Sequence, residues 1–257
     1  MTAEGYTADE MMAVAAARRL RDGEVCFVGI GLPSRAANHA RATHAPNSVL
    51  IYESGTIGAK PRSLPHSIGD GELAETADAV VSVPEIFSYW LQAGRIDVGF
   101  LGAAQVDRHG NLNSTVIGEY EHPSVRLPGA GGAPEIAASC RDTLVMLRQT
   151  RRAFVERLDF RSTVGHGDGA STRDELGYPG GGVTAVVTDL GVLEPNPETR
   201  ELTLTRVHAG VTVEEACAAT GWNLRVARDV EVGEPPSETE LTALRALKTA
   251  NDQDSGE

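Results

Sequence analysis

The sequence has few cysteines, a minority of basic side chains and no long apolar run. Its three cysteines, Cys26, Cys140 and Cys217, lie far apart and form no CxxC or Cys/His pattern, so we expect buried thiols in a reducing cytosol and no metal site. With 23 Lys and Arg against 36 Asp and Glu, the formal net charge is −13, which argues against nucleic acid or an anionic membrane as the main partner. No stretch is long enough to cross a bilayer and the N-terminus has no apolar signal core, so the sequence predicts a cytoplasmic protein.

What the chain does contain is ordinary for a globular protein. It has 257 residues, of which 41% are hydrophobic and 23% charged. This length suits one large α/β domain or two small ones. We expect a single domain over residues 1–248, followed by a polar tail at 249–257 that frays.

Short apolar runs alternate with helical segments. A helix over residues 8–21 is expected to begin at Thr7, with Glu10 in the capping-box position, and a later helix is capped by Thr212. A hairpin is expected at 192–206. Further helices are expected at 31–41 and 84–91, and strands at 25–30, 49–52, 78–83, 97–102, 143–147 and 183–188. This order predicts an α/β fold with a mostly parallel sheet and helices on both faces.

Four glycine-rich turns follow strands or precede helices. In a parallel sheet, ligands bind outside the carboxyl ends of the strands, and glycine lets the backbone approach them closely. Free N–H groups at such turns can hold an anion or an oxyanion. Four turns in one chain, one of them carrying an acid, therefore indicate a binding site; they lie at 29–34, 53–58, 101–115 and 128–137.

The first of these turns does not match a nucleotide-binding motif. The segment GIGLPS has Gly29 and Gly31 but Ser34 where a third glycine belongs, and no P-loop lysine is present. Dinucleotide or ATP binding is therefore not expected.

An acid, Glu53, ends the apolar run at 49–52. A carboxylate is ionised at neutral pH and needs no partner base to attack, so Glu53 can act as a nucleophile or as a general base. It can equally be a helix cap or a salt-bridge partner. Lys60, Arg62 and His66 follow closely and either pair with Glu53 or bind phosphates of an anionic substrate.

Several other polar residues have two interpretations. Gln105 and Asn111 either contact a ligand or fix the turn between Gly102 and Asn113, and Asn113 is itself either a turn residue or a ligand contact. Arg126 either binds a substrate carboxylate or lies on the surface in solvent or an ion pair.

The glycine-rich segment 165–182 is expected to be a surface loop or lid, with a direct role in the site as the alternative. His109 and His166 are expected to be exposed loop residues rather than acids or bases.

Taken together, these segments resemble the β subunit of class I CoA-transferases of the glutaconate CoA-transferase type. GIGLP resembles the family's first glycine turn, and ESG the turn with its catalytic glutamate, where many class I enzymes have SENG. LGAAQVDRHGNLNSTVIG resembles the family's G-x-Q-x-D-x-x-G-N segment, and PGAGGA its G-x-G-G-A loop. The similarity runs from about Thr7 to about Leu241. It implies the three-layer α/β/α fold of the CoA-transferase and NagB/RpiA-like proteins.

The resemblance also implies a mechanism and a set of site residues. Glu53 would attack an acyl-CoA, form an acyl-glutamyl anhydride and then carry CoA as a glutamyl thioester to a second carboxylic acid. No metal is implied. The implied oxyanion and CoA contacts are Gly31, Gln105, Gly131, Gly132 and Ala133, and the implied substrate contacts are Ser54, Gly55, Lys60 and Arg126. Pro134 departs from a free glycine loop because it removes one backbone donor.

The implied partners are a separate α subunit of the same superfamily, in an α2β2 or larger assembly, together with coenzyme A as acyl-CoA and a carboxylic acid, a dicarboxylic acid among the candidates. Two alternatives remain at this point. One is an acyl-CoA hydrolase or decarboxylase on the same scaffold, and the other is a non-catalytic CoA-binding subunit. Glu53 favours transfer over both, since several hydrolytic and decarboxylating relatives replace it.

Overall fold

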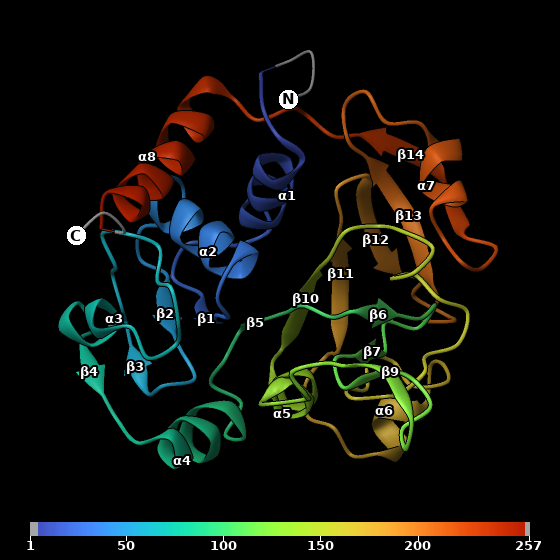
Figure 1. Ribbon diagram of the computed structural model, residues 1–257, viewed down its shortest axis with the longest axis horizontal. Coiled ribbons are helices and arrows are strands. Elements are labelled where there is room, and N and C mark those ends of the chain that lie inside the picture. Colours follow the sequence, from blue (N-terminus) through green and yellow to red (C-terminus); the bar gives the residue numbers. More distant parts are fainter. Residues whose placement is uncertain (1–4, 255–257) are drawn as a thin grey trace. The chain divides into compact units, whose positions relative to one another are not determined.

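The computed structural model describes residues 5–254, with side chains described up to residue 247 (Figure 1). The chain divides into two compact units. Unit 1 comprises the chain up to Phe100 and from Pro235 onward, and unit 2 comprises Leu101–Glu234. The prediction of one domain over 1–248 stays a prediction, with two compact units inside it. Residues 249–254 continue the last helix rather than form a separate tail, and the rest of the predicted tail lies outside the described residues.

The sheet of unit 1 is parallel at its centre. Strand β1 (Val25–Phe27) pairs in parallel with β2 (Val49–Ile51) on one side and β5 (Val98–Leu101) on the other. Beyond β2, the short strands β3 (Thr56–Ile57) and β4 (Ala79–Val80) run antiparallel. All four residues of β5 are buried, as its unbroken apolar sequence predicts, whereas both residues of β4 are exposed.

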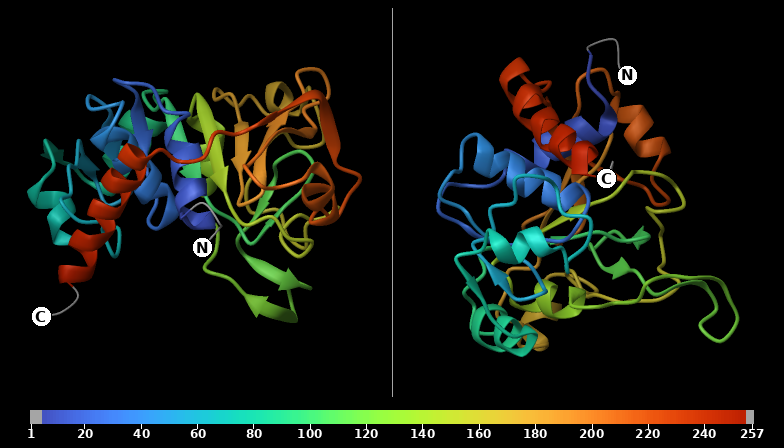
Figure 2. Two further views of the ribbon diagram at one scale, coloured as in Figure 1. Left: turned by 90° about the horizontal axis from the view of Figure 1, so that it is seen from above. Right: turned by 60° about the vertical axis from the view of Figure 1, so that its left-hand side comes forward.

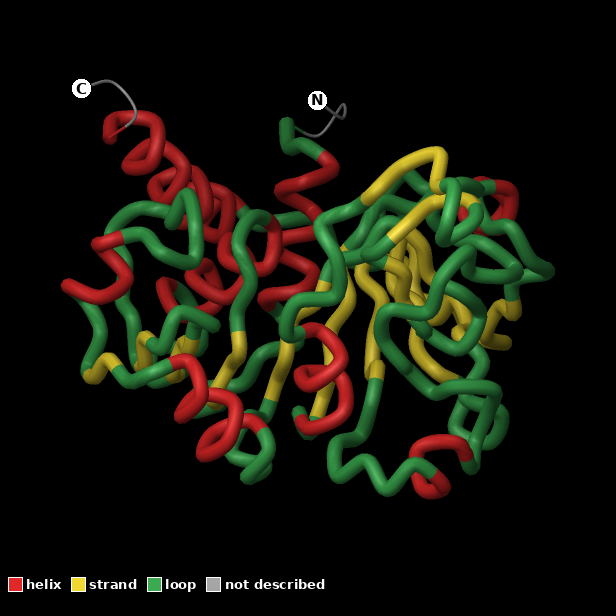
Figure 3. Tube along the Cα trace, turned by 60° about the horizontal axis from the view of Figure 1, so that its bottom comes forward, coloured by secondary structure: helices red, strands yellow, loops and turns green. Residues whose placement is uncertain are grey.

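The three longest helices belong to unit 1 and pack against one another: α1 (Ala8–Ala17), α2 (Leu32–Ala42) and α8 (Glu238–Asp254) (Figure 3). The predicted capping box of α1 is confirmed, since Glu10 N–H donates to the Thr7 hydroxyl and Thr7 N–H to the Glu10 carboxylate. The short helices of this unit are α3 (Gly71–Glu75), α4 (Val83–Glu85) and the π-helix η1 (Ile86–Leu91).

A partly buried ion pair joins α1 to α8. Arg245 Nε donates to Glu10 Oε1 at 2.7 Å, and this hydrogen bond holds the pKa of the Glu10 carboxyl at about 2. Because the pKa is lowered, the stabilisation is complete above the ordinary value of 4.5 and is lost as the pH falls through about 2.

We therefore expect Glu10→Gln to lower the free energy of unfolding by about 2 kcal/mol at neutral pH, a figure discounted because the arginine is half exposed. The loss should shrink steadily below pH 4.5. Urea unfolding at several pH values measures this difference, with Glu75→Gln on the exposed surface of α3 as the control. A loss that does not change with pH would contradict the assignment of the stabilisation to the ionised carboxylate.

The sheet of unit 2 is mixed. Strands β10 (Asp142–Met146) and β11 (Val183–Val187) are parallel, β11 and β12 (Gly191–Pro195) antiparallel, and β12 and β13 (Leu202–Val207) form the predicted hairpin. Strand β14 (Arg225–Val232) pairs in parallel with β13 at the edge. The predicted α/β class, with a mostly parallel mixed sheet and flanking helices, is confirmed.

Two small hairpins complete unit 2. One joins β6 (Gln105–Val106) to β7 (Leu112–Asn113). The other joins β8 (Val116–Gly118) to β9 (Pro123–Arg126) and extends away from the sheet of its unit (Figure 2). The helices of this unit are all short: α5 (Ala133–Ser139), α6 (Thr172–Glu175) and α7 (Val213–Ala218), the last with the predicted cap at Thr212.

Some elements were not predicted. Strand β14 was missed because six of its eight residues are exposed and four are charged, and helix α8 was missed because its polar end resembles a tail. Cys26 and Cys140 are buried thiols outside any disulfide, as expected, whereas Cys217 is only half-buried. None of the helices in the described part of the chain has the length and hydropathy of a membrane span.

Candidate active site

Glu53 lies at the corner of a tight turn at the carboxyl end of β2. Tyr52 N–H donates to Thr56 O at 3.1 Å, and Gly55 N–H donates to Tyr52 O at 3.0 Å. Glu53 and Ser54 are therefore the two central residues of a β-turn that connects β2 to β3. The chain reverses here, so the acid is presented beyond the end of a buried strand, as the sequence predicts.

The backbone conformation and the close packing of this turn require a glycine at position 55. Gly55 has a φ of +107°, and a Cβ built there would lie 2.0 Å from the backbone oxygen of Val81. The two segments also share a hydrogen bond, since Val81 N–H donates to Gly55 O at 3.0 Å. A side chain at Gly55 would push β4 off the turn, so the turn that presents Glu53 depends on the absence of a Cβ.

The Glu53 carboxylate does not stabilise the fold through a hydrogen bond or an ion pair with the described residues. Its side chain is half-buried and makes no hydrogen bond or ion pair with any of the residues that the structure describes. It does not cap a helix, because the next helix along the chain, α3, begins at Gly71 and is capped by Asp70. The cap and salt-bridge alternatives are therefore wrong, and Glu53 stays available for chemistry.

The basic residues that follow Glu53 have other partners. Lys60 Nζ lies 2.5 Å from Asp78 Oδ1 on the surface, and Arg62 is 4.0 Å from Glu72. The backbone N–H of His66 donates to Asp70. Pairing with Glu53 is thus wrong for all three, and the substrate-binding role of Lys60 stays a prediction.

Two hydroxyls beside Glu53 are buried and unpaired. Neither Ser54 Oγ nor Thr56 Oγ1 has a hydrogen-bond partner among the described residues. Both residues follow the unpaired acid closely in the chain, so their hydroxyls are available to a ligand that binds at Glu53. Ser54 was predicted as a substrate contact. Thr56 was missed, although its place three residues after the acid in the same turn was a usable signal.

The first glycine turn leads into α2. Gly31 is the N-cap residue, with a φ of +82° and no side chain capping the helix. It is exposed, and a Cβ there would meet nothing within 4 Å, so the turn leaves open space around its backbone. A buried hydrogen bond between Ser34 Oγ and Tyr52 Oη connects this turn to the Glu53 turn within unit 1.

The remaining predicted residues lie in unit 2. Gln105 is buried, and its Nε2 donates to Asp159 Oδ2 at 2.9 Å while its Oε1 accepts from Asn113 Nδ2 at 2.7 Å. Asn113 also donates to Val116 O. Both side chains therefore hold together the segment that runs from β6 through β7 to β8, which favours the structural alternative for Gln105. Its role as an oxyanion donor stays a prediction.

The glycine loop before α5 has two free donors. Ala133 N–H donates to Ala130 O at 3.0 Å, whereas the N–H groups of Gly131 and Gly132 have no acceptor among the described residues. Pro134 sits in the first turn of the helix, where its missing N–H removes no helical hydrogen bond. Of the three predicted backbone donors, only the two glycines are available.

Arg126 lies at the end of the β8–β9 hairpin. Its guanidinium stacks over the Tyr120 ring at 5.3 Å and donates to Tyr120 O at 3.3 Å. Tyr120 in turn stacks on Phe160, with the ring centroids 5.4 Å apart. The arginine is exposed and has no acidic partner among the described residues, so its guanidinium is available to bind a substrate carboxylate, and that role stays a prediction.

The segment 165–182 has many exposed residues, as expected of a surface loop, but hydrogen bonds fix its backbone. Asn111 Oδ1 accepts from both Gly165 N–H and Gly167 N–H at 3.0 Å, and Arg173 is buried with hydrogen bonds to four backbone carbonyls. His166 is 2% exposed and donates from Nε2 to Val183 O, and burial lowers its pKa. The expectation of an exposed His166 is therefore wrong, and His109 is half-buried.

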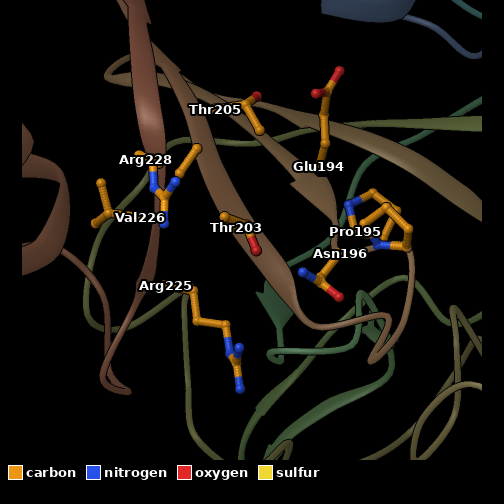
Figure 4. A pocket seen from close by; sticks show the side chains of 10 residues that line it. Glu194, Pro195, Asn196, Thr203, Thr205, Arg225, Val226 and Arg228 are labelled. Atoms are coloured by element: carbon orange, nitrogen blue, oxygen red, sulfur yellow. The ribbon is translucent and has the colours of Figure 1, made fainter.

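Two cavities lie in unit 2, and neither is lined by a predicted site residue. One of about 490 Å³ borders Asp159, the partner of Gln105. The other, of about 510 Å³, lies over β13 and β14, and no residue predicted to act chemically faces it (Figure 4). Its polar lining consists of Glu194, Asn196, Thr203, Thr205, Arg225 and Arg228. Among the described residues, no group of three or more His, Cys, Asp or Glu side chains is arranged to hold a metal ion.

The comparisons with known proteins cover nearly the whole chain. The coenzyme A transferase family matches residues 9–219. The B subunit of 3-oxoadipate CoA-transferase from Pseudomonas knackmussii is 60% identical over 256 residues, which are 98% of each protein. The corresponding polypeptide of glutaconate CoA-transferase from Acidaminococcus fermentans is 36% identical over 236 residues, 90% of this chain and 88% of that protein.

Solved structures agree with these matches. Glutaconate coenzyme A-transferase from Acidaminococcus fermentans has a TM-score of 0.88 at 33% identity over 94% of each chain. The decarboxylase AibA/AibB has a TM-score of 0.82 at 26% identity, over 97% of this chain and 98% of that chain. These matches confirm the resemblance predicted from the motifs: the chain belongs to the coenzyme A transferase family, as the β subunit of a heteromeric class I CoA-transferase.

Proposed function

We propose that this chain carries the nucleophile of a transferase that moves CoA from an acyl-CoA to a dicarboxylic acid of the 3-oxoadipate kind. The observation that carries the proposal is Glu53, an unpaired carboxylate at the corner of a turn whose neighbouring hydroxyls are also unpaired. The substrate class is supported by the 60% identity to a protein named for 3-oxoadipate.

The reaction proceeds by two acyl transfers to and from Glu53. A carboxylate oxygen of Glu53 attacks the thioester carbonyl, and the C–S bond breaks to give an acyl-glutamyl anhydride and CoA thiolate. The thiolate attacks the glutamyl carbonyl of the anhydride, the donor acid leaves as a carboxylate, and CoA remains as a glutamyl thioester. A second carboxylate reverses these steps and departs as its CoA ester.

Each step passes through a tetrahedral oxyanion that needs aimed donors. The Ser54 and Thr56 hydroxyls are free to donate within unit 1, and the Gly131 and Gly132 N–H groups are free within unit 2. One such donor contributes about 2.7–4 kcal/mol to lowering the barrier. Gly31 supplies backbone contacts to CoA, and Arg126 and Lys60 are the cations assigned to the carboxylates of the acids. No metal takes part in this scheme.

A partner α subunit completes the site and excludes water, which would otherwise hydrolyse the anhydride. The relatives are named as B subunits, which supports a separate A subunit, and we assign an α2β2 or larger assembly in the cytoplasm. Cys26 and Cys140 form no disulfide, which suits a reducing compartment.

The test is peptide mass spectrometry on the complex with its partner after incubation with a panel of acyl-CoAs. A CoA adduct confined to the peptide containing Glu53 is expected, strongest with the true donor. Consumption of acyl-CoA to free acid without adduct would favour hydrolysis. Loss of CO₂ would favour decarboxylation, the activity named for one structure of the same fold. Binding without turnover would favour a non-catalytic subunit.

Several large apolar side chains are exposed in the segment that follows the Glu53 turn in unit 1, and we assign them to a docking site for the partner subunit. Strand β4 lies beside the Glu53 turn, because it pairs with β3 and Val80 is the partner of Thr56. Large apolar side chains are rarely exposed together on a chain that acts alone. The exposed ones in this part of unit 1 are Ile68, Val80, Val83 and Tyr89.

We expect Tyr89→Asp to weaken the affinity for the partner α subunit at least about tenfold, because it places a charge in a buried interface. Tyr89 is 62% exposed in this chain, so the variant should fold normally. Co-assembly is measured by titrating the labelled α subunit. Leu176→Asp, at a residue 50% exposed in unit 2, is the matched control. If the wild type and Tyr89→Asp bound the α subunit with equal affinity, this surface would not be part of the interface.

A further inference from the structure

A buried cluster of three polar side chains lies directly behind the nucleophile turn. Ser34 and Asn38 are one helical turn apart on α2, and Tyr52 follows the last residue of β2. All three are at most 1% exposed. Burying polar side chains is costly unless they are hydrogen-bonded, so their presence in the core calls for a specific role.

The Tyr52 hydroxyl is held from two sides. Ser34 Oγ and Tyr52 Oη are 3.1 Å apart, and Asn38 Nδ2 donates to Tyr52 Oη at 3.1 Å. Asn38 Nδ2 also donates to the backbone oxygen of Ser34 at 2.9 Å, which orients the amide. The tyrosine hydroxyl is therefore fixed to α2 by two side-chain contacts, while Asn38 Oδ1 has no hydrogen-bond partner among the described residues.

The backbone of the same residue frames the Glu53 turn at both ends. Tyr52 N–H donates to Thr56 O, and Tyr52 O accepts from Gly55 N–H. Both backbone hydrogen bonds that close the turn are therefore made by Tyr52. The ring and the turn are thus connected through the backbone of a single residue. The network thus connects the turn that carries the nucleophile to the helix that starts at Gly31.

We propose that Tyr52 is a positioning residue that, through its hydroxyl and the Ser34–Asn38 pair, holds Glu53 in register with the glycine turn at Gly31. This inference rests on the proposed role of Glu53 as nucleophile. The hydroxyl acts only as a neutral hydrogen-bonding group, because burial raises its pKa above the ordinary tyrosine range. It exchanges no proton with the substrate.

The cluster was not predicted from the sequence. Tyr52 is 14 residues from Asn38 in the chain, and no spacing rule connects them. A phenol in an apolar run is as a rule a core residue, and only the placement of its hydroxyl shows the connection to α2.

The test is the rate at which the glutamyl-CoA thioester forms on Glu53 in a single turnover, measured by quenching the complex with its partner and quantifying the adduct peptide. Tyr52→Phe keeps the ring and removes the hydroxyl. It should slow adduct formation by about 10- to 100-fold at saturating acyl-CoA, the scale of a misplacement of about 1 Å, with KM changed less than about twofold. It should also raise the ratio of hydrolysis to transfer.

The matched control is Tyr6→Phe, which removes another buried tyrosine hydroxyl of unit 1 and should leave the adduct rate within about twofold. Ser34→Ala should slow the rate in the same direction, and the double variant should be no slower than Tyr52→Phe alone, since the two side chains act as one unit. Ser34→Ala also carries the test if Tyr52→Phe does not assemble.

An adduct rate that Tyr52→Phe or Ser34→Ala leaves unchanged, with only a lower melting temperature, would overturn the inference and leave a structural role. A wild-type complex that forms no adduct at Glu53 overturns the proposed function and this inference together. Adduct in the wild type with no slowing in the variants overturns this inference alone.

Discussion

Replacing Glu53 by glutamine is expected to reduce CoA transfer by about 10⁴-fold or more. The amide has the size of the carboxylate but lacks the anionic oxygen that attacks the thioester, so the covalent route is lost. Losses of this scale follow removal of the nucleophile in other enzymes with covalent intermediates. Binding of acyl-CoA should change little, because the half-buried side chain makes no hydrogen bond with the described residues that the substitution would break.

The measurement is the steady-state rate of CoA transfer between two acids by the reconstituted complex, together with the dissociation constant for acyl-CoA. Glu75→Gln, at an exposed acid of the same unit, should match the wild type. If Glu53→Gln kept more than about a hundredth of the wild-type rate, the acid would be a base or a binding group, and the hydrolase alternative would gain.

Gly55→Ala is expected to remove most of the activity and to lower the free energy of unfolding by about 3 kcal/mol or more. The residue has a φ of +107°, which costs an L-residue about 1–2 kcal/mol, and the new Cβ would lie 2.0 Å from Val81 O. Relief of that clash requires β4 to move away from the turn, which also displaces Glu53. A shift of about 1 Å at a nucleophile costs about 100-fold in rate.

Urea unfolding and the transfer assay measure the two effects on the same protein. Gly71→Ala is the matched control, because Gly71 begins α3 and a Cβ there meets nothing within 4 Å. That substitution should be neutral or stabilise by up to about 1 kcal/mol. Should Gly55→Ala unfold at the wild-type urea concentration and keep full activity, the turn would be more adaptable than its geometry indicates.

Local signals were predicted well. The capping box at Thr7 and the cap at Thr212 depend on residues within one helical turn, and the hairpin of β12 and β13 on the turn between them. Such patterns act within a few residues, so their physics is present in the sequence itself. The glycine turns belong to the same class, and Gly31 and Gly55 both have the positive φ that their presence suggests.

The errors came from contacts between distant segments. His166 was expected to be an exposed loop residue, but Asn111, 56 residues before Gly167, binds the backbone beside it, and Arg173 binds carbonyls of α5. Lys60 was considered a partner of Glu53 because it is near in sequence, yet Asp78 holds it. Proximity along the chain does not measure proximity in space once a hairpin reverses direction.

By itself, the sequence determined the α/β class, the turn that presents Glu53, the other glycine turns and the family. Each of these depends on residue types at short, fixed spacings. The tertiary structure alone decided that Glu53 has no partner among the described residues, that Ser54 and Thr56 have free hydroxyls, and that Tyr52 is bound to α2. Whether a polar group is free or paired depends on which distant segments pack around it, because a hydrogen bond is set by distance and direction and not by order along the chain.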